Sequence, residues 1–247
     1  KVVYENIEIA FPGTDEKTKY AWMKKSIFVL AKNLFDLFKV PQVNKKWVDS
    51  HVVIHGRENI DLYKDQGVFF LTLHMASGDL AAAAVSEVVK PLSLISKRFS
   101  SVFMDEFWFY IRQKSKTLFI DAHSKENAFE ILKALKKGRG VVFVLDQFMG
   151  KPYGIASKFF GRWTGTQKGL ALFALKTGAP VIPIYTYRGT DLKTHVRIEE
   201  PVLWDAEGDK DLQIQVMTEK YNHRLEDIIR RHKEQWMWVH RRWKKFE

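Results

Sequence analysis

The sequence predicts an α/β fold with one central, mostly parallel or mixed sheet and helices on both of its faces. Short apolar runs rich in Val, Ile, Leu and Phe alternate along the chain with longer stretches whose apolar residues recur at helical spacing. The 247 residues are 46% hydrophobic and 28% charged, which is a globular composition with enough apolar material for a sizeable core. No internal repeat or Gly/Ser/Pro-rich linker divides the chain, so residues 1–247 are expected to form a single domain.

The first predicted element is a long helix that starts near Thr14 and ends before Pro41. Thr14 is followed by two acidic residues, which is typical of a helix N-terminus. Lysines line one side of this helix, and the other side is apolar and aromatic. It carries Ile27, Ala31, Leu34, Phe35 and Phe38. The helix either covers the core as a surface helix or presents its aromatic side to a membrane.

After that helix, extended and helical segments alternate. Strands are predicted at 51–56, 67–74, 91–96, 116–121, 140–146, 179–188 and 195–201. Helices are predicted at 77–89, 100–114, 124–138, 166–178 and 211–232. Gly178 is the expected C-terminal cap of its helix. In sheets of this kind, ligands bind beside the carboxyl ends of the strands.

Two ionisable residues, His74 and Asp79, lie at the junction of a predicted strand and a predicted helix. With His74 on the turn, Asp79 could accept a hydrogen bond from one ring nitrogen and leave the other nitrogen as a base. The helix N-terminus would favour developing negative charge, and Gly78 would let a substrate approach the backbone. The alternative interpretation is structural: His74 ends a strand, Asp79 suits the helix dipole, and Ser77 is an N-cap.

The charge balance favours an anionic partner. Forty Lys and Arg residues against 29 Asp and Glu residues give a net charge of +11 and a pI near 9.6. Aromatic residues make up 14% of the chain, and basic plus aromatic composition suits either single-stranded nucleic acid or a membrane surface. The absence of cysteine excludes disulfides, thiolate-bound zinc and a cysteine acyl-enzyme. No stretch is long and apolar enough to predict a membrane-spanning helix, and no signal peptide opens the chain.

A second stretch repeats the pattern of strand, polar turn and helix. Asp146 and Gln147 end a buried strand, and a glycine-rich, basic and aromatic loop follows before the next helix. The chain end, EQWMWVHRRWKKF, adds three tryptophans and a run of bases. Interleaved tryptophans and bases predict an interfacial anchor.

Four segments, taken in order, resemble the lipid A biosynthesis acyltransferase family within the lysophospholipid and glycerol-phosphate acyltransferase superfamily. They are NIEIAFPGTDEKTK, LTLHMASGDLAA, DQFMGKPYGIASKFFGRWTGTQKGLALFALKTGAPVIP and QWMWVHRRWK. The resemblance covers essentially the whole chain and implies a glycerol-phosphate acyltransferase-like fold. It also implies that an N-terminal membrane helix of the family lies just upstream of Lys1, outside these residues.

The resemblance implies a role for particular residues. His74 would be the general base of a His-x-x-x-x-Asp motif, and Asp79 its orienting partner, where many lipid A acyltransferases have Glu. Arg112 would bind phosphate or support the oxyanion, although an arginine on a helix is by default a solvated residue. The other substrate-side positions would be Asp146, Gln147, Phe160, Gly161, Arg162, Thr166 and either Lys97 or Arg98. Read singly, Asp146 could merely cap a loop and Gly161 could be a turn residue.

The implied reaction moves a fatty acyl chain from an acyl-carrier protein thioester to a hydroxyl of a lipid A precursor or related glycolipid. His74 would take the hydroxyl proton. No cofactor or metal is expected, because none of the 8 histidines forms a HExxH-like pair. The expected partners are the acidic carrier protein, the anionic glycolipid acceptor and the membrane surface. The expected location is the cytoplasmic face of the bacterial inner membrane.

Three other functions stay open. A sister enzyme would acylate a lysophospholipid, a glycerol phosphate or another glycolipid, and would use acyl-carrier protein or acyl-CoA. A nucleic-acid binding protein is disfavoured, because no recognition motif is present and the bases are spread along the chain. A membrane-surface scaffold without catalysis is the third. We therefore expect no nucleic-acid partner.

Overall fold

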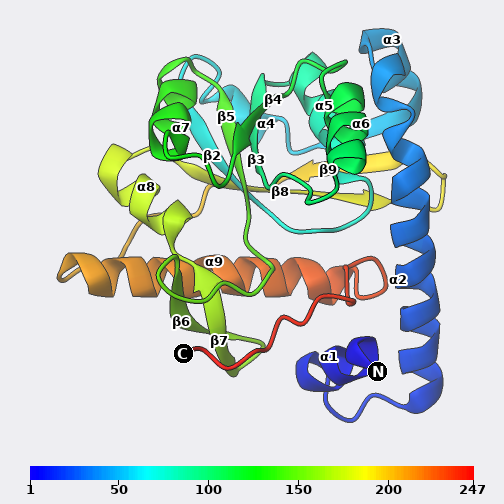
Figure 1. The fold of residues 1–247 in the computed structure, drawn as a ribbon, viewed down its shortest axis with the longest axis vertical. Coiled ribbons are helices and arrows are strands. Elements are labelled where there is room, and N and C mark those ends of the chain that lie inside the picture. Colours follow the sequence, from blue (N-terminus) through cyan, green and yellow to red (C-terminus); the bar gives the residue numbers. More distant parts are fainter.

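A computed structural model describes all 247 residues, and its centre is a seven-stranded sheet of order β1-β9-β8-β2-β5-β3-β4 (Figure 1). The strands β8, β2, β5, β3 and β4 run parallel to one another, whereas β9 pairs antiparallel with β8 and parallel with β1. The predicted α/β class with a mostly parallel, mixed sheet is confirmed. The strands are β1 (Val52–His55), β2 (Val68–Thr72), β3 (Leu92–Ser96), β4 (Leu118–Asp121), β5 (Gly140–Val144), β8 (Val181–Arg188) and β9 (Thr194–Ile198).

Helices cover both faces of this sheet. On one face lie α7 (Asn127–Lys136), α8 (Gly169–Thr177) and α9 (Lys210–Arg231), and on the other lie α3 (Lys45–His51), α4 (Glu58–Asp61) and α5 (Gly78–Val88). Because side chains alternate along a strand, β2 sends Phe69 and Leu71 into the first layer and Val68 and Phe70 into the second. Both layers are buried, which explains why β2 reads as one unbroken apolar run.

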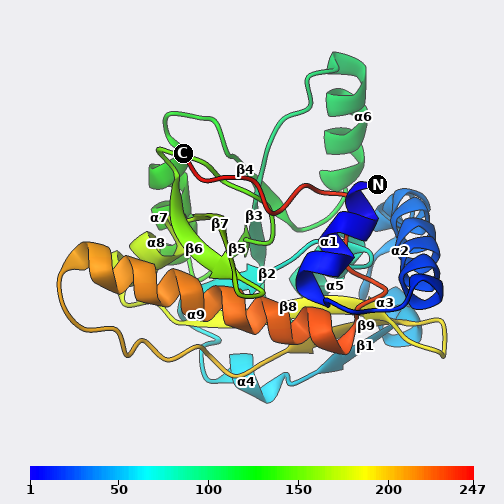
Figure 2. The same cartoon turned by 90° about the horizontal axis from the view of Figure 1, so that it is seen from below.

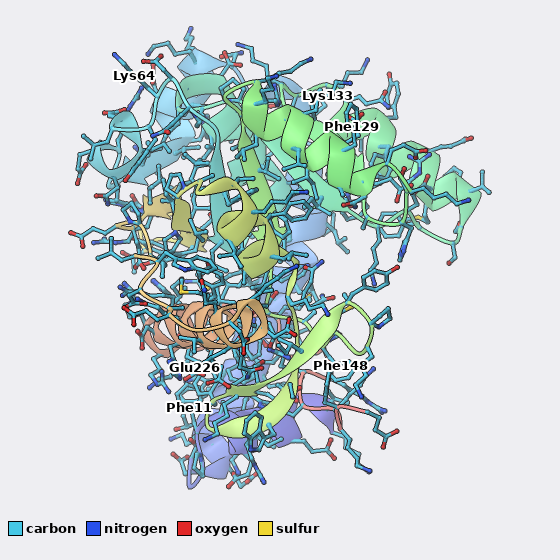
Figure 3. The ribbon with its side chains drawn as sticks, turned by 90° about the vertical axis from the view of Figure 1, so that its left-hand side faces the viewer. Phe11, Lys64, Phe129, Lys133, Phe148 and Glu226 are labelled. Atoms are coloured by element: carbon cyan, nitrogen blue, oxygen red, sulfur yellow. The ribbon has the colours of Figure 1, made fainter.

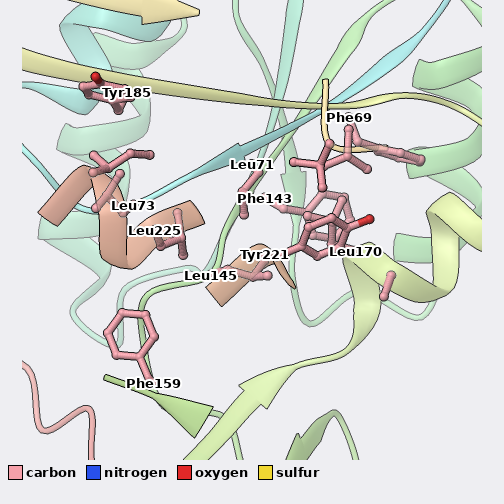
Figure 4. Close-up of a cluster of buried hydrophobic side chains, with 14 of the residues drawn as sticks. Phe69, Leu71, Leu73, Phe143, Leu145, Phe159, Leu170, Tyr185, Tyr221 and Leu225 are labelled. Carbon is pink, nitrogen blue, oxygen red and sulfur yellow. The ribbon is translucent and has the colours of Figure 1, made fainter. Parts of the chain in front are cut away.

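The first layer is the larger of the two hydrophobic clusters. Figure 4 shows its strand residues Phe69, Leu71 and Phe143 beside Leu170 of α8 and Tyr221 of α9. The rings of Phe69 and Phe143 meet edge to face, with centroids 5.8 Å apart. This layer lies directly beneath the strand ends that carry the polar residues described below.

The N-terminal part of the chain forms α1 (Val2–Ala10) and the long α2 (Glu16–Leu37), which runs along one side of the molecule (Figure 1). The helix begins at Glu16, two residues after Thr14, because the Asp15 carboxylate accepts from the Thr18 N–H at 2.9 Å and caps the helix. A short 3₁₀ turn, η1 (Val40–Gln42), follows. No helix in the structure combines the length and the apolarity needed to cross a bilayer.

Part of the segment predicted as a glycine-rich loop is instead an antiparallel hairpin of β6 (Gly154–Phe159) and β7 (Arg162–Gln167), packed against α9 (Figure 1). Phe160 and Gly161 form its two-residue turn with φ of 50° and 72°, the geometry that matches the twist of a hairpin. A phenylalanine at positive φ is unfavourable, so sequence did not predict this turn. Tertiary packing holds it, because the Phe160 ring contacts the rings of Phe11, Phe159 and Trp243.

The chain after α9 is not the interfacial anchor that its tryptophans predict. It turns back and passes the hairpin on its way to the C-terminus (Figure 2). Trp236 and Trp238 are 1% and 0% exposed and belong to the large core cluster. Their rings meet edge to face, with centroids 4.5 Å apart. These tryptophans therefore contribute to the core and cannot insert into a lipid surface.

We expect Gly56 to be a critical glycine of the sheet edge. It follows β1 at φ +73°, and a Cβ there would lie 2.0 Å from the backbone oxygen of Ile198 in β9. The change Gly56→Ala should lower the free energy of unfolding by about 3 kcal/mol, from left-handed strain plus overpacking. Gly13→Ala is the matched control, because Gly13 has φ +78° and open space around it, and should lose only about 1 kcal/mol. Urea unfolding measures the loss of stability in both variants. Equal losses would show that Gly56→Ala suffers no clash with Ile198.

Candidate active site

The carboxyl ends of β2 and β5 place two ionisable residues side by side. These strands are parallel neighbours whose register pairs Thr72 with Val144. His74 and Asp146 each lie two residues beyond that pair, so both leave the same edge of the sheet. His74 Nδ1 lies 2.8 Å from Asp146 Oδ1, and the His74 backbone N–H donates to Asp146 Oδ2 at 2.9 Å. We call His74 and Asp146 the dyad.

Asp146 is buried but held ionised. Its side chain is 1% exposed, and the carboxylate accepts a third hydrogen bond, from Trp236 Nε1 to Oδ2 at 2.7 Å. Burial alone would raise the pKa of Asp146, but the charge and hydrogen bond of His74, with the Trp236 and backbone donors, hold it below its usual range. An ionised carboxylate only accepts hydrogen bonds, so His74 Nδ1 must carry the proton that joins the two residues.

The other imidazole nitrogen of His74 is free. Because Nδ1 donates to Asp146, Nε2 bears a lone pair, and no protein group hydrogen-bonds to it. The side chain is 40% exposed, so a reacting molecule can reach this nitrogen. Burial alone would lower the pKa of His74, but the charge and hydrogen bond of Asp146, together with the charge of Asp79, raise it above its usual value. This arrangement suits a general base.

The expected hydrogen bond from His74 to Asp79 is not formed. Asp79, in the first turn of α5, accepts instead from Arg112 Nε at 2.7 Å. Asp146 takes the place assigned to Asp79 because the register of β2 and β5 brings it directly to Nδ1. Asp79 remains close enough for its charge to favour the protonated form of His74.

Arg112 is engaged by protein groups. It ends α6 (Val102–Arg112), its side chain is 11% exposed, and a second nitrogen donates to Ser96 Oγ at 3.0 Å. Its guanidinium also lies within 5.5 Å of the ring centroids of Trp108, Phe109 and Phe119. In the structure Arg112 therefore holds Asp79, and the phosphate or oxyanion contact stays a prediction.

The loop between His74 and α5 is tied to α2 by a buried polar network. Ser77 was considered as an N-cap, but its hydroxyl donates to Asp36 of α2 instead, and α5 has no side-chain cap. Asp36 is 1% exposed and pairs with Arg188 at the end of β8 and with Lys39 at 2.7 Å. Burial alone would raise the pKa of Asp36, but Lys39, Ser77 and Arg188 lower it overall.

Gly78 begins α5 and lies beside open space, because a Cβ there would meet no atom within 4 Å. The N–H groups of the first turn of a helix have no acceptors within that helix. They are therefore available to a negatively charged oxygen near His74. Gln147, which follows Asp146, is half-buried, and its amide makes no hydrogen bond within the protein.

The remaining substrate-side residues do not gather at the dyad. Thr166 is fully buried, and its hydroxyl is hydrogen-bonded to Ser157, Asn222 and Arg242. A substrate therefore cannot reach this hydroxyl. Phe160, Gly161 and Arg162 lie at the turn of the hairpin, where Phe160 is packed among aromatic rings. Of the two basic candidates, Lys97 is exposed, and Arg98 pairs with Asp105 at 3.2 Å. For Phe160, Gly161, Arg162 and Thr166, the physical reason is that the predicted loop folds into the strands β6 and β7.

Sequence reasoning missed Trp236, Asp36 and Arg188. Trp236 and Trp238 alternate in a way that is typical of an extended segment with one buried face, which competes with an interfacial anchor. Asp36 stands alone as a carboxylate in the apolar run NLFDLF, a position that favours a buried, paired charge. Arg188 carried no local signal. No group of three or more His, Asp and Glu side chains lies close enough together to hold a metal ion.

Comparison with known proteins matches residues 1–245 to the family described as bacterial lipid A biosynthesis acyltransferase. A lipid A biosynthesis acyltransferase of Haemophilus influenzae is 20% identical over 237 residues, covering 95% of this chain and 72% of the relative. A lipid A biosynthesis palmitoleoyltransferase of Escherichia coli is 22% identical over 250 residues, covering 98% and 78%. Among solved structures, a 1-acyl-sn-glycerophosphate acyltransferase of Thermotoga maritima aligns with a TM-score of 0.43 at 15% identity, over 92% of this chain and 95% of that one.

We expect His74 to titrate above its ordinary pKa of about 6.5 in an NMR titration of the imidazole protons. In Asp146→Asn the pKa of His74 should fall, because the larger of the two charges that oppose the effect of burial is removed and only that of Asp79 remains. A raised folded-state pKa stabilises the fold below about pH 6.5, and this stabilisation is lost as the pH rises through the folded-state value. An unchanged titration in Asp146→Asn would rule out the ion pair.

Proposed function

The chain belongs to the bacterial lipid A biosynthesis acyltransferase family, and on that premise we propose that it transfers a fatty acyl chain from an acyl-carrier protein thioester to a hydroxyl of a lipid A precursor. The observation that carries this proposal is the free Nε2 of His74, backed through Nδ1 by a buried, ionised Asp146. A hydroxyl is a poor nucleophile at neutral pH, and a general base typically supplies about 10²–10⁴ in rate.

In the proposed step, His74 Nε2 takes the hydroxyl proton as the oxygen attacks the thioester carbonyl. A C–O bond forms, and the carbonyl oxygen becomes an oxyanion near the first turn of α5, whose N–H groups stabilise it. Collapse breaks the C–S bond, and the departing thiolate takes the proton from the imidazolium of His74. Asp146 orients the ring throughout, and the charges of Asp146 and Asp79 both stabilise the imidazolium.

A basic surface beside the dyad supports anionic substrates. From Gln147 to Lys176 the chain has five Lys and Arg residues and no carboxylate, and its last eight residues are HRRWKKFE. The two segments meet next to the dyad, where the Phe148 N–H donates to His240 Nε2 at 3.1 Å and Lys244 lies 5.5 Å from the Phe148 ring (Figure 3). Such a surface attracts an acidic carrier protein and a phosphorylated glycolipid.

An exposed aromatic face on α2 and α6 supports a place on the membrane. Phe35 and Phe103 are 70% and 75% exposed, and the Phe38 and Phe107 rings, 5.9 Å apart, join the two helices. α6 stands out from the body beside α2 (Figure 2). The other large exposed hydrophobic residues of the two helices are Tyr20, Ile27, Phe28, Leu34, Val102, Met104 and Tyr110. With Lys24 exposed on α2 and Lys97 exposed in the loop before α6, the face fits the inner membrane's anionic cytoplasmic leaflet.

We expect His74→Ala to lower kcat/KM at least about 10³-fold, because no other base lies at that position. Asp146→Asn should lower it about 10³-fold as well, since an amide can donate to Nδ1 and shift the proton to Nε2. His223→Ala, at an exposed position on α9, is the matched control and should keep wild-type activity. The assay follows acyl transfer by mass spectrometry from acyl-carrier protein and acyl-CoA donors to lipid A precursor and lysophospholipid acceptors. Full activity of His74→Ala with any pair would refute the mechanism.

The double change Phe35→Asp with Phe103→Asp should weaken binding to anionic phospholipid vesicles at least about 10-fold. Burying one such side chain stabilises the bound state by about 1.5–3 kcal/mol, and a carboxylate would instead be repelled. Leu203→Asp tests the same kind of change at a residue that is 75% exposed and lies outside both helices. Co-sedimentation at two salt concentrations measures the partition, and equal losses in the two proteins would argue against this face.

A further inference from the structure

Trp236 supplies the third hydrogen bond to the buried carboxylate of the dyad. It comes from the segment after α9, 90 residues away along the chain from Asp146, and its indole Nε1 donates to Asp146 Oδ2 at 2.7 Å. Trp236 and Asp146 are both fully buried. The mechanism uses His74 and Asp146, and nothing in it requires a tryptophan at this position.

The same segment is bonded to the backbone around His74. Met75 and Trp236 form an isolated antiparallel bridge, and the Met237 N–H donates to the His74 carbonyl oxygen at 3.1 Å. Trp236 therefore cannot shift relative to the dyad without breaking contacts at His74 and Met75. Its indole is therefore held at a fixed position relative to His74 and Asp146.

We infer that Trp236 is a positioning residue of the dyad, a role that rests on the proposed function. Two N–H groups, the indole of Trp236 and the backbone of His74, bind Asp146 Oδ2. They set the plane of the carboxylate so that Oδ1 points at Nδ1 of His74. Without the indole, a single donor holds Oδ2, and the plane of the carboxylate, and with it the orientation of the imidazole bonded to Oδ1, is less firmly set.

The charged and titratable groups that face the dyad decide the sign of the effect. They are Asp79 from α5 and two residues of the C-terminal segment, His240 and Arg242. The change Trp236→Phe alters none of these charges. It removes one neutral donor that spreads the charge of Asp146, so the carboxylate attracts the proton of His74 more strongly. The pKa of His74 should therefore rise, and the acidic limb of the kcat/KM profile should move to higher pH.

The test compares Trp236→Phe with Trp238→Phe in the full chain. The Trp238 indole donates to the Lys233 carbonyl oxygen at 2.6 Å and is 0% exposed, so each change removes one buried indole hydrogen bond and keeps a buried ring. We expect a similar loss of thermal stability in both. Trp236→Phe should lower kcat about 10-fold, the effect of one hydrogen bond to a charged group, with KM within about 3-fold. The acidic limb should move up by about half a pH unit. Trp238→Phe should keep the wild-type kcat and profile.

A second measurement needs no tryptophan variant. In the wild-type protein, the indole N–H NMR signal of Trp236 should shift as the pH passes through the pKa of His74, and Asp146→Asn should displace it, whereas the Trp238 signal should do neither. Identical kcat values, pH profiles and His74 titrations in the two tryptophan variants, or an indole signal that ignores the dyad, would overturn the role of Trp236. If the proposed function is wrong, His74→Ala will keep full activity. The His74 titrations and the Trp236 indole signal would still test whether Trp236 positions the dyad.

Discussion

A single buried carboxylate organises this site. Removing the charge of Asp146 from water is unfavourable, and three N–H donors from two distant parts of the chain offset that penalty. Two come from His74, which the parallel register of β2 and β5 places level with Asp146, and one comes from Trp236. Together these donors keep the carboxylate ionised although it is buried, so dyad geometry and the fold of the C-terminal segment depend on each other.

The loop that carries His74 is held on both sides by ion pairs. On one side Ser77 joins the buried pair of Asp36 and Arg188, and on the other Asp79 is joined to Arg112. These pairs connect the loop to α2 and α6, the same two helices that carry the exposed aromatic face. Breaking one member of a buried pair leaves an uncompensated charge, so these contacts constrain where α2 and α6 can lie relative to the dyad.

The C-terminal segment reaches the hairpin through a buried arginine that has no carboxylate partner. Arg242 is 0% exposed and donates to the Gly165 carbonyl oxygen at 2.6 Å and to the Thr166 hydroxyl at 2.6 Å, and it lies 4.5 Å from the ring centroid of Phe159. Burial lowers the pKa of Arg242 to about 10, so it still carries its charge at neutral pH. Backbone and hydroxyl oxygens thus take the place of a counter-ion. They hold in place the C-terminal segment, whose His240 accepts from the Phe148 N–H.

Sequence alone was sufficient for the elements whose signal is local. Unbroken apolar runs predicted the buried strands, helical spacing predicted α2, α5 and α9, and the resemblance carried by four ordered segments predicted the family. The position of His74 at a strand end also follows from its run of apolar neighbours, since burial on both faces leaves few other places for a polar side chain.

Only the tertiary structure decided which group His74 contacts. Asp79 is five residues away and Asp146 is 72, yet parallel pairing of β2 with β5 brings the distant one into hydrogen-bond range while Arg112 takes the near one. The hairpin turn at Phe160 and the burial of Trp236 depend in the same way on rings from other parts of the chain. Local sequence records propensity and burial, whereas strand order and long-range pairing depend on the free energy of the whole assembled fold.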